Sequence, residues 1–83
     1  MDPQLLAERL GLQIQEMRLQ RGLTIIELAA RANVTRQKVS EIEKGKLTVS
    51  MLLYAKVLSS MGAELKAVPA RRPTLDELRE VFK

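Results

Sequence analysis

Cysteine and histidine are absent from this chain of 83 residues. The chain therefore has no disulfide, no thiolate or imidazole for catalysis, and none of the usual nitrogen and sulfur ligands of a zinc site. Carboxylates remain, but Glu41 and Glu43 are two positions apart and would point in different directions on a helix. We predict that the protein is not an enzyme and that it uses no metal and no cofactor.

Long apolar runs are also missing, and aromatic residues are scarce, with one Tyr and one Phe. No segment has the length of a membrane span and no signal peptide opens the chain, so we expect a cytoplasmic protein. A chain of 83 residues forms one domain with a modest aliphatic core, which oligomerisation would help to stabilise.

The most informative stretch present is residues 24–45, which has the pattern of two short helices joined by a tight turn. Thr24 and Glu27 have the spacing of a capping box at the start of the first helix. Asn33 tolerates the left-handed backbone that ends helices, and Thr35 can cap the second helix. The apolar residues at helical spacing in the first helix are Ile25, Leu28, Ala29 and Ala32.

The second of these helices has little apolar surface. Val39 and Ile42 form a narrow inward stripe, and Gly45 ends the helix. A helix this short is not stable alone, so we expect its outward face to serve a function. That face comprises Arg36, Gln37, Lys38, Ser40 and Glu41. Residues 35–46 also carry four basic and two acidic side chains, whereas residues 1–34 carry four of each, and this bias favours nucleic acid.

Further helices are predicted on either side of this pair. Asp2 and Pro3 are typical of a helix start, and because Gly11 costs about 1 kcal/mol relative to alanine, we expect regular helix only after it. The inward stripe of this helix is Leu6, Leu10, Ile14 and Met17. Thr48 is predicted to cap a last helix, ending at Gly62, that is apolar almost all round. That last helix is the central core helix, the neighbour of a dimer partner, or both.

Residues 63–69 have the length and rough alternation of a β-strand, and Pro69 excludes helix at their end. A lone strand leaves its backbone donors and acceptors unpaired, so we predict that it pairs with a second copy of the chain. Antiparallel pairing about Leu65 would place Glu64 of one copy opposite Lys66 of the other. The predicted dimerisation residues are Glu64, Leu65, Lys66 and Ala67. The alternative is an extended linker.

The last residues have the pattern of one more short helix. Thr74 and Glu77 repeat the capping-box spacing, and an apolar stripe follows them. Some nine residues do not hold a helix alone in water, so this segment would dock on its own dimer or in the groove of a different protein. The apolar residues of the stripe are Leu78, Val81 and Phe82.

The residues quoted above resemble a known family. The chain resembles the helix-turn-helix family of phage Cro and repressor proteins. The pattern that carries the resemblance is Leu23-Thr24, Glu27-Leu28-Ala29, Ala32-Asn33-Val34-Thr35, Val39-Ser40 and Ile42-Glu43-Lys44-Gly45. The resemblance covers about residues 10–61 and implies a mainly all-α, lambda-repressor-like bundle of four to five helices, to which the predicted strand is added across a dimer. We predict a DNA-binding domain in residues 1–62 and a C-terminal part in residues 63–83 for dimerisation or partner binding.

In that family the second helix of the pair enters the major groove, and its first residues contact base edges. Carried over to this sequence, the resemblance assigns base contacts to Arg36 and Gln37. The residues on or beside the groove-facing side are then Lys38, Ser40 and Glu41. The Glu41 carboxylate would either accept a hydrogen bond from a cytosine amino group or point toward a lysine of its own helix.

The resemblance also has one departure. The position after Thr24 is usually a glutamine that helps to anchor the helix on the phosphate backbone, and here it is Ile25. We assign the anchoring to Thr24, Lys44 and Lys46, and Thr35 completes the predicted DNA-binding set. Family members pair an arginine of the first helix with the glutamate before the terminal glycine, so the resemblance implies a structural ion pair between Arg18 and Glu43.

Together these features predict a sequence-specific transcriptional repressor that binds a palindromic operator in double-stranded DNA as a homodimer, with half-sites roughly 34 Å apart. The ending Met61-Gly62-Ala63-Glu64-Leu65 followed by a strand resembles the small antitoxins that accompany HipA-type kinases. That resemblance implies a protein that represses its own operon and holds a toxin. The alternatives are a solitary phage-like or chromosomal regulator and, in another class, a protein-binding adaptor that does not bind DNA.

Overall fold

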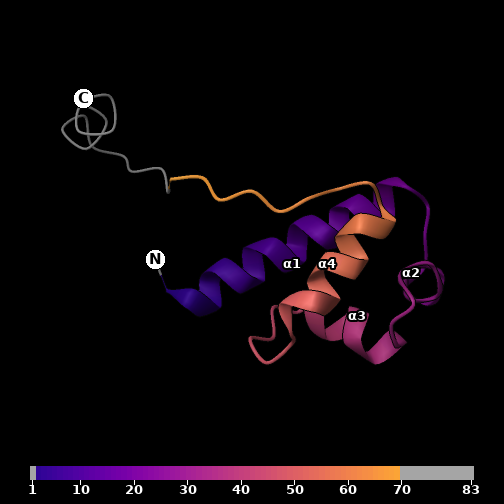
Figure 1. Cartoon of the computed structure of the whole chain (residues 1–83), viewed down its shortest axis with the longest axis horizontal. Coiled ribbons are helices and arrows are strands. Elements are labelled where there is room, and N and C mark those ends of the chain that lie inside the picture. Colours follow the sequence, from indigo (N-terminus) through magenta and orange to yellow (C-terminus); the bar gives the residue numbers. More distant parts are fainter. Residues whose placement is uncertain (1, 70–83) are drawn as a thin grey trace.

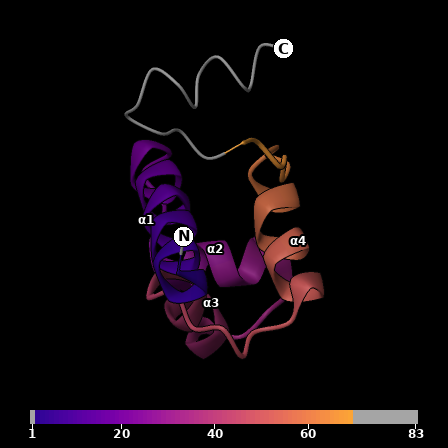
Figure 2. The same ribbon diagram turned by 90° about the vertical axis from the view of Figure 1, so that its left-hand side faces the viewer.

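The computed structural model describes residues 2–69, which form four helices (Figure 1). These are α1 (Pro3–Gln20), α2 (Ile25–Ala32), α3 (Arg36–Glu43) and α4 (Met51–Ser60). In Figure 2, α1 and α4 stand on opposite sides and α2 lies between them. The mainly helical bundle that the sequence predicts is therefore confirmed, while the predicted helix after residue 73 lies outside the described residues.

The first helix is longer than predicted. Asp2 caps it as expected, because its Oδ1 accepts a hydrogen bond from the Gln4 backbone at 3.2 Å, but α1 then continues through Gly11 without a break. A Cβ at Gly11 would lie 2.6 Å from the backbone carbonyl oxygens of both Ile42 and Glu43. The expectation that regular helix starts after Gly11 was wrong, because this glycine allows the end of α3 to pack directly on α1.

All four helices contribute to one core. The side chains with no exposed surface are Ile14, Leu28, Val39, Ile42 and Val57. The first four come from apolar stripes that the sequence predicts, and Val57 comes from the helix that was predicted to be apolar almost all round. In contrast, α4 buries only one of its sides and leaves Leu52 63% exposed on the other. None of the helices within residues 2–69 is both long and apolar enough to cross a membrane.

The last helix starts later than predicted. Its N-cap is Ser50, whose hydroxyl accepts a hydrogen bond from the Leu53 backbone at 3.4 Å, and Thr48 lies exposed in the preceding loop. Val49 is buried in the core within this loop, and the Tyr54 hydroxyl donates to the Lys46 carbonyl at 3.3 Å. These contacts keep residues 46–49 out of the helix, so the assignment of the cap to Thr48 was wrong.

Residues 63–69 form no strand, and no other strand is present in residues 2–69 with which they could pair. Figure 1 shows them running back along α1 as extended chain. Ala63 packs against the core, while Leu65 and Val68 border a groove beside α1. The predicted strand and its pairing across a dimer are thus not supported, and the chain has the extended form that we gave as the alternative.

Candidate nucleic-acid interface

Local hydrogen bonds define the turn between α2 and α3. At the start of α2, the Thr24 backbone donates to Glu27 Oε1 at 2.9 Å and the Glu27 backbone donates to Thr24 Oγ1 at 3.1 Å, which completes the predicted capping box. The bond donated by the Thr24 backbone stabilises the carboxylate and holds the pKa of Glu27 below its ordinary value. The helix ends at Asn33, which has a left-handed φ of 57°, and Thr35 then caps α3 by accepting from the Lys38 backbone at 3.1 Å.

A buried ion pair holds the far end of α3. Arg18 Nε and Glu43 Oε2 are 2.7 Å apart, and Arg18 Nη2 donates to Glu43 Oε1 at 3.1 Å. A third bond joins Arg18 Nη1 to the Leu23 carbonyl at 2.9 Å. The two charged residues are only 7% and 8% exposed. Because this network joins α1, the approach to α2 and the end of α3, it fixes the position of α3 relative to the two preceding helices.

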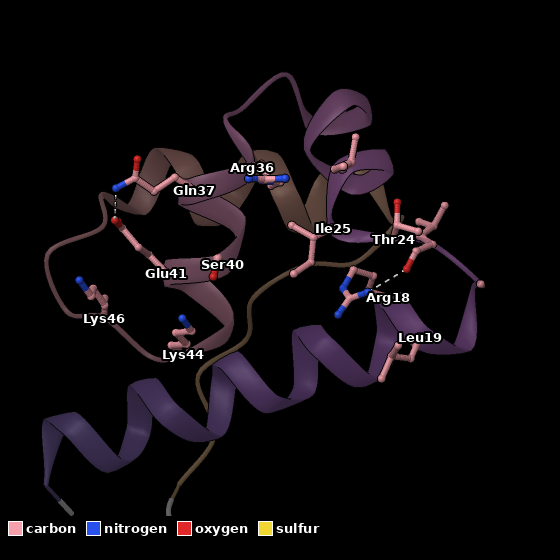
Figure 3. A pocket seen from close by; sticks show the side chains of 13 residues that line it. Arg18, Leu19, Thr24, Ile25, Arg36, Gln37, Ser40, Glu41, Lys44 and Lys46 are labelled. Atoms are coloured by element: carbon pink, nitrogen blue, oxygen red, sulfur yellow. Dashed lines mark hydrogen bonds between the residues drawn. The ribbon is translucent and has the colours of Figure 1, made fainter.

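The outward side of α3 borders a surface depression shared with the start of α2 and the end of α1 (Figure 3). All the predicted DNA-binding residues except Thr35 and Lys38 line it. They are Thr24, Arg36, Gln37, Ser40, Glu41, Lys44 and Lys46. The fold thus brings residues from two helices and the loop after α3 to a single concave surface.

The remaining two residues lie beside this depression. Thr35 is exposed at the cap of α3, and Lys38 turns its Nζ toward Glu41 Oε1 at 3.2 Å. Glu41 Oε2 also accepts from Gln37 Nε2 at 3.2 Å. The carboxylate of Glu41 therefore points along its own helix, the second of the two predicted orientations. The hydrogen bond from Lys38 lowers the pKa of Glu41, so this carboxyl stays ionised at neutral pH.

Pairing of the two carboxylates leaves this surface positively charged. Glu43 is paired with Arg18 and Glu41 with Lys38. The exposed cations on this side form no salt bridge with any other described residue, and they are Arg36, Lys44 and Lys46. Exposed cations around a concave surface suit a polyanionic partner.

Comparison with known proteins fits this geometry. A family model described as helix-turn-helix matches residues 14–65. The chain belongs to the helix-turn-helix family. A protein of Methanothermobacter thermautotrophicus named as an uncharacterized HTH-type transcriptional regulator is similar to it, with 41% identity over 51 residues that make up 61% of this chain and 74% of the relative.

Three apolar side chains line one border of this helix-turn-helix surface. Ile25 is partly buried against the core and also lines the depression, where Figure 3 shows it between α3 and Arg18. Ile26 and Leu19 are each 60% exposed beside it. Neither Ile26 nor Leu19 is among the site residues predicted from the sequence. They could have been found in the sequence as large apolar residues that lie outside the inward apolar stripes of α2 and α1.

The predicted dimerisation residues lie elsewhere in this helix-turn-helix protein. Those residues are Glu64, Leu65, Lys66 and Ala67, and all of them are exposed. None borders the depression beside α3. Leu65 keeps 44% of its surface exposed even though it lines the groove along α1. The structure therefore separates this segment from the candidate nucleic-acid interface.

Proposed function

We propose that this protein is a sequence-specific transcriptional regulator that inserts α3 into the major groove of DNA. The observation that carries this proposal is the polar outward side of α3, which the buried pair of Arg18 and Glu43 holds in place. Together with the loop after α3 it exposes the cations Arg36, Lys44 and Lys46. Membership of the helix-turn-helix family and the name of the similar regulator support it.

Base contacts are assigned to the first turn of α3. Arg36 and Gln37 are exposed there, immediately after the Thr35 cap. An arginine can donate two hydrogen bonds to the O6 and N7 atoms of guanine, and a glutamine can pair with adenine. Ser40 lies one turn further along the same depression and can reach a base or a phosphate.

Phosphate contacts are assigned to the two ends of the depression. Thr24 lies at the start of α2, while Lys44 and Lys46 follow α3. Ile25 has no polar group in its side chain, so it cannot make the phosphate contact that glutamine makes at this position in the family. These contacts orient the protein on the duplex without specifying its sequence.

A homodimer and a palindromic operator complete the proposal. An α3 of eight residues contacts only a few base pairs, so a single copy would select its site poorly. Support for a partner comes from α4, where Met51 and Leu52 are 66% and 63% exposed and Ala55 lies on the same side. We assign the interface to this α4 face, because exposed apolar surface gains free energy when a second copy covers it.

Repression of its own operon as the antitoxin of a HipA-type pair remains a prediction. It depends on the resemblance of residues 61–65, and of the segment after them, to those antitoxins. The segment after residue 65 lies outside the residues that the helix-turn-helix family model matches. Purification of the protein from its native cell tests it directly. A kinase-like protein recovered in stoichiometric amount would support the antitoxin, and a homodimer recovered alone would favour a solitary regulator.

The DNA-binding function is tested with a duplex selected from a random pool and a scrambled duplex of equal length, using fluorescence anisotropy. Arg36→Ala should cost about 1 to 3 kcal/mol of binding free energy on the selected duplex and little on the scrambled one. Lys46→Ala should weaken both equally and reduce the slope of log K against log salt by about one.

Arg9→Ala is the matched control, because Arg9 is exposed on α1 and lines the groove away from α3. If Arg36→Ala left the preference for the selected duplex intact, the assignment of α3 to the major groove would be wrong. If the wild type bound neither duplex at low salt, the protein-binding adaptor would be the better interpretation.

A further inference from the structure

Three side chains on the outward face of α3 form a hydrogen-bonded cluster. Gln37 Nε2 donates to Glu41 Oε2 and Lys38 Nζ donates to Glu41 Oε1, each at 3.2 Å. The Glu41 side chain is only 16% exposed, although it belongs to the outward side of a surface helix. The carboxylate is thus held against its own helix by one neighbour on each oxygen.

This cluster fixes the orientation of the Gln37 amide. An ionised carboxylate only accepts hydrogen bonds, so the group that Gln37 turns toward Glu41 must be its amide nitrogen. Figure 3 shows that nitrogen directed at Glu41 and the amide oxygen directed away from it. The low pKa of Glu41 keeps the carboxyl in its accepting form across the physiological range.

The groups that Gln37 leaves free match one base in particular. Its Oε1 is an acceptor, and its Nε2 retains one hydrogen after donating to Glu41. Adenine presents a donor at N6 and an acceptor at N7 in the major groove, which pairs with one acceptor and one donor of a glutamine. Guanine presents two acceptors there, so an amide whose second hydrogen is already engaged cannot satisfy both.

We propose that Glu41 is a positioning residue that presets Gln37 to recognise adenine, so that each half-site contains an A·T pair opposite Gln37. This inference rests on the proposed function, since it requires α3 to lie in the major groove. Lys38 has a separate part, because its ammonium group offsets the repulsion between the Glu41 carboxylate and the DNA phosphates.

Direct recognition of cytosine by Glu41 is the competing possibility. A carboxylate can accept a hydrogen bond from cytosine N4 when it is free to face the groove. Here each oxygen of Glu41 already accepts from a residue of the same helix, and little of the side chain is exposed. The contacts therefore favour an indirect action of Glu41 through Gln37.

Selection of binding sites from randomised duplexes tests the proposal, followed by affinities for duplexes that differ by one base pair. The wild type should select an A·T pair at one position of each half-site, and Gln37→Ala should lose that preference. Glu41→Gln should relax the same position by about tenfold, because the new amide can donate as well as accept and no longer fixes Gln37. Lys38→Met should weaken binding to every duplex while the A·T preference is kept.

The ratio of affinities is the decisive quantity, since removal of a negative charge raises affinity for any DNA. Glu16→Gln is the matched control, because Glu16 carries the same charge on the exposed side of α1 that lines the other groove, and it should leave the ratio unchanged. Thermal unfolding followed by circular dichroism checks that each variant is folded.

Two results would overturn the inference while leaving the proposed function in place. In the first, Glu41→Gln binds DNA with the wild-type ratio at the Gln37 position. In the second, Glu41→Gln loses a G·C preference at a different position, as a direct cytosine contact requires. Absence of DNA binding by the wild type would overturn the inference together with the proposed function.

Discussion

The outward faces of α3 and α4 differ in what they present to a partner. Both helices bury one narrow stripe in the same core, and Val39 and Val57 are each fully buried. On its other side α3 exposes Arg36 and Gln37, whereas α4 exposes Leu52. The buried stripes thus explain the fold, while the side chains left outside carry the function that we propose for each helix.

The two faces also differ in the physics of binding that they allow. Charged side chains attract phosphates through a field that salt screens over about 8 to 10 Å, so contacts made by α3 should weaken as salt is added. Apolar side chains gain roughly 25 cal/mol for each square ångström removed from water, which salt changes little. Binding through α3 and association through α4 can therefore be separated by experiment.

The largest expected effect comes from removing Arg18 from the buried ion pair that holds α3 in place. Arg18→Met leaves the Glu43 carboxylate buried without a partner, and loss of one partner of a buried pair costs about 3 to 5 kcal/mol. The free energy of unfolding, measured with urea, should fall by an amount in that range. Operator binding should be lost with it, although no residue assigned to a base has been changed.

The double variant Arg18→Met/Glu43→Leu separates the two causes. Apolar replacement of both members of a buried pair is often neutral for stability. We therefore expect it to recover most of the unfolding free energy. A double variant as unstable as the single one would show that the hydrogen bond from Arg18 to the Leu23 carbonyl, and not the ion pair, holds the helices together.

The second effect concerns the α4 face. Leu52→Glu places a charge at the centre of the proposed interface and should convert a dimer of two 9.4 kDa chains into a monomer, as measured by light scattering. Affinity for a full palindrome should fall about 100-fold or more, because the two α3 helices no longer bind as one unit. Affinity for a single half-site should stay the same.

Two control variants locate the interface. Leu12→Glu changes an exposed leucine of α1 that lines the other groove, and Leu65→Pro alters the segment that was predicted to be a strand. Both should remain dimeric. If either became monomeric while Leu52→Glu stayed dimeric, the interface would lie along α1 and residues 63–69, and its assignment to α4 would be wrong.

The contrast between correct and incorrect predictions follows the range of the interactions involved. Both ends of α2 and the start of α3 were predicted correctly, because capping bonds join residues within a few positions of one another. The residues that predicted them are Thr24, Glu27, Asn33 and Thr35. The Gly11 prediction failed because its reason is a contact with the end of α3, which is distant in sequence. The helix propensity of glycine does not depend on which distant segment packs against it, so it could not predict this contact.

The candidate site was predictable to a similar extent. The outward residues of α3 followed from the positions of Val39 and Ile42, so Arg36 and Gln37 could be chosen before the fold was known. The hydrogen bond from Gln37 to Glu41 could not be predicted, because the spacing along the helix places several possible donors within reach of the Glu41 carboxylate. For residues 63–69, alternation of side chains did not specify a strand, since a strand also requires a partner.

The smallest effect concerns the link between the two faces. The Tyr54 hydroxyl of α4 donates to the carbonyl of Lys46, which lies in the loop after α3. Tyr54→Phe removes this bond and should lower the free energy of unfolding by about 0.5 to 1.5 kcal/mol at neutral pH. Affinity for DNA should fall slightly and equally on all sequences, because the loop that carries Lys46 is less well held.

The pH dependence of the same variant gives a second measurement. Burial raises the pKa of the Tyr54 phenol above its ordinary value of 10.0, so the unfolded chain loses this proton before the folded protein does. Stability contributed by the protonated phenol is therefore complete below pH 10.0 and declines as the pH rises toward the folded pKa. The stability difference between wild type and Tyr54→Phe should shrink over that range. Because Tyr54 is the one tyrosine of the chain, tyrosinate absorbance reports its titration directly, and a titration at or below the ordinary pKa would contradict the buried phenol and its bond to the loop.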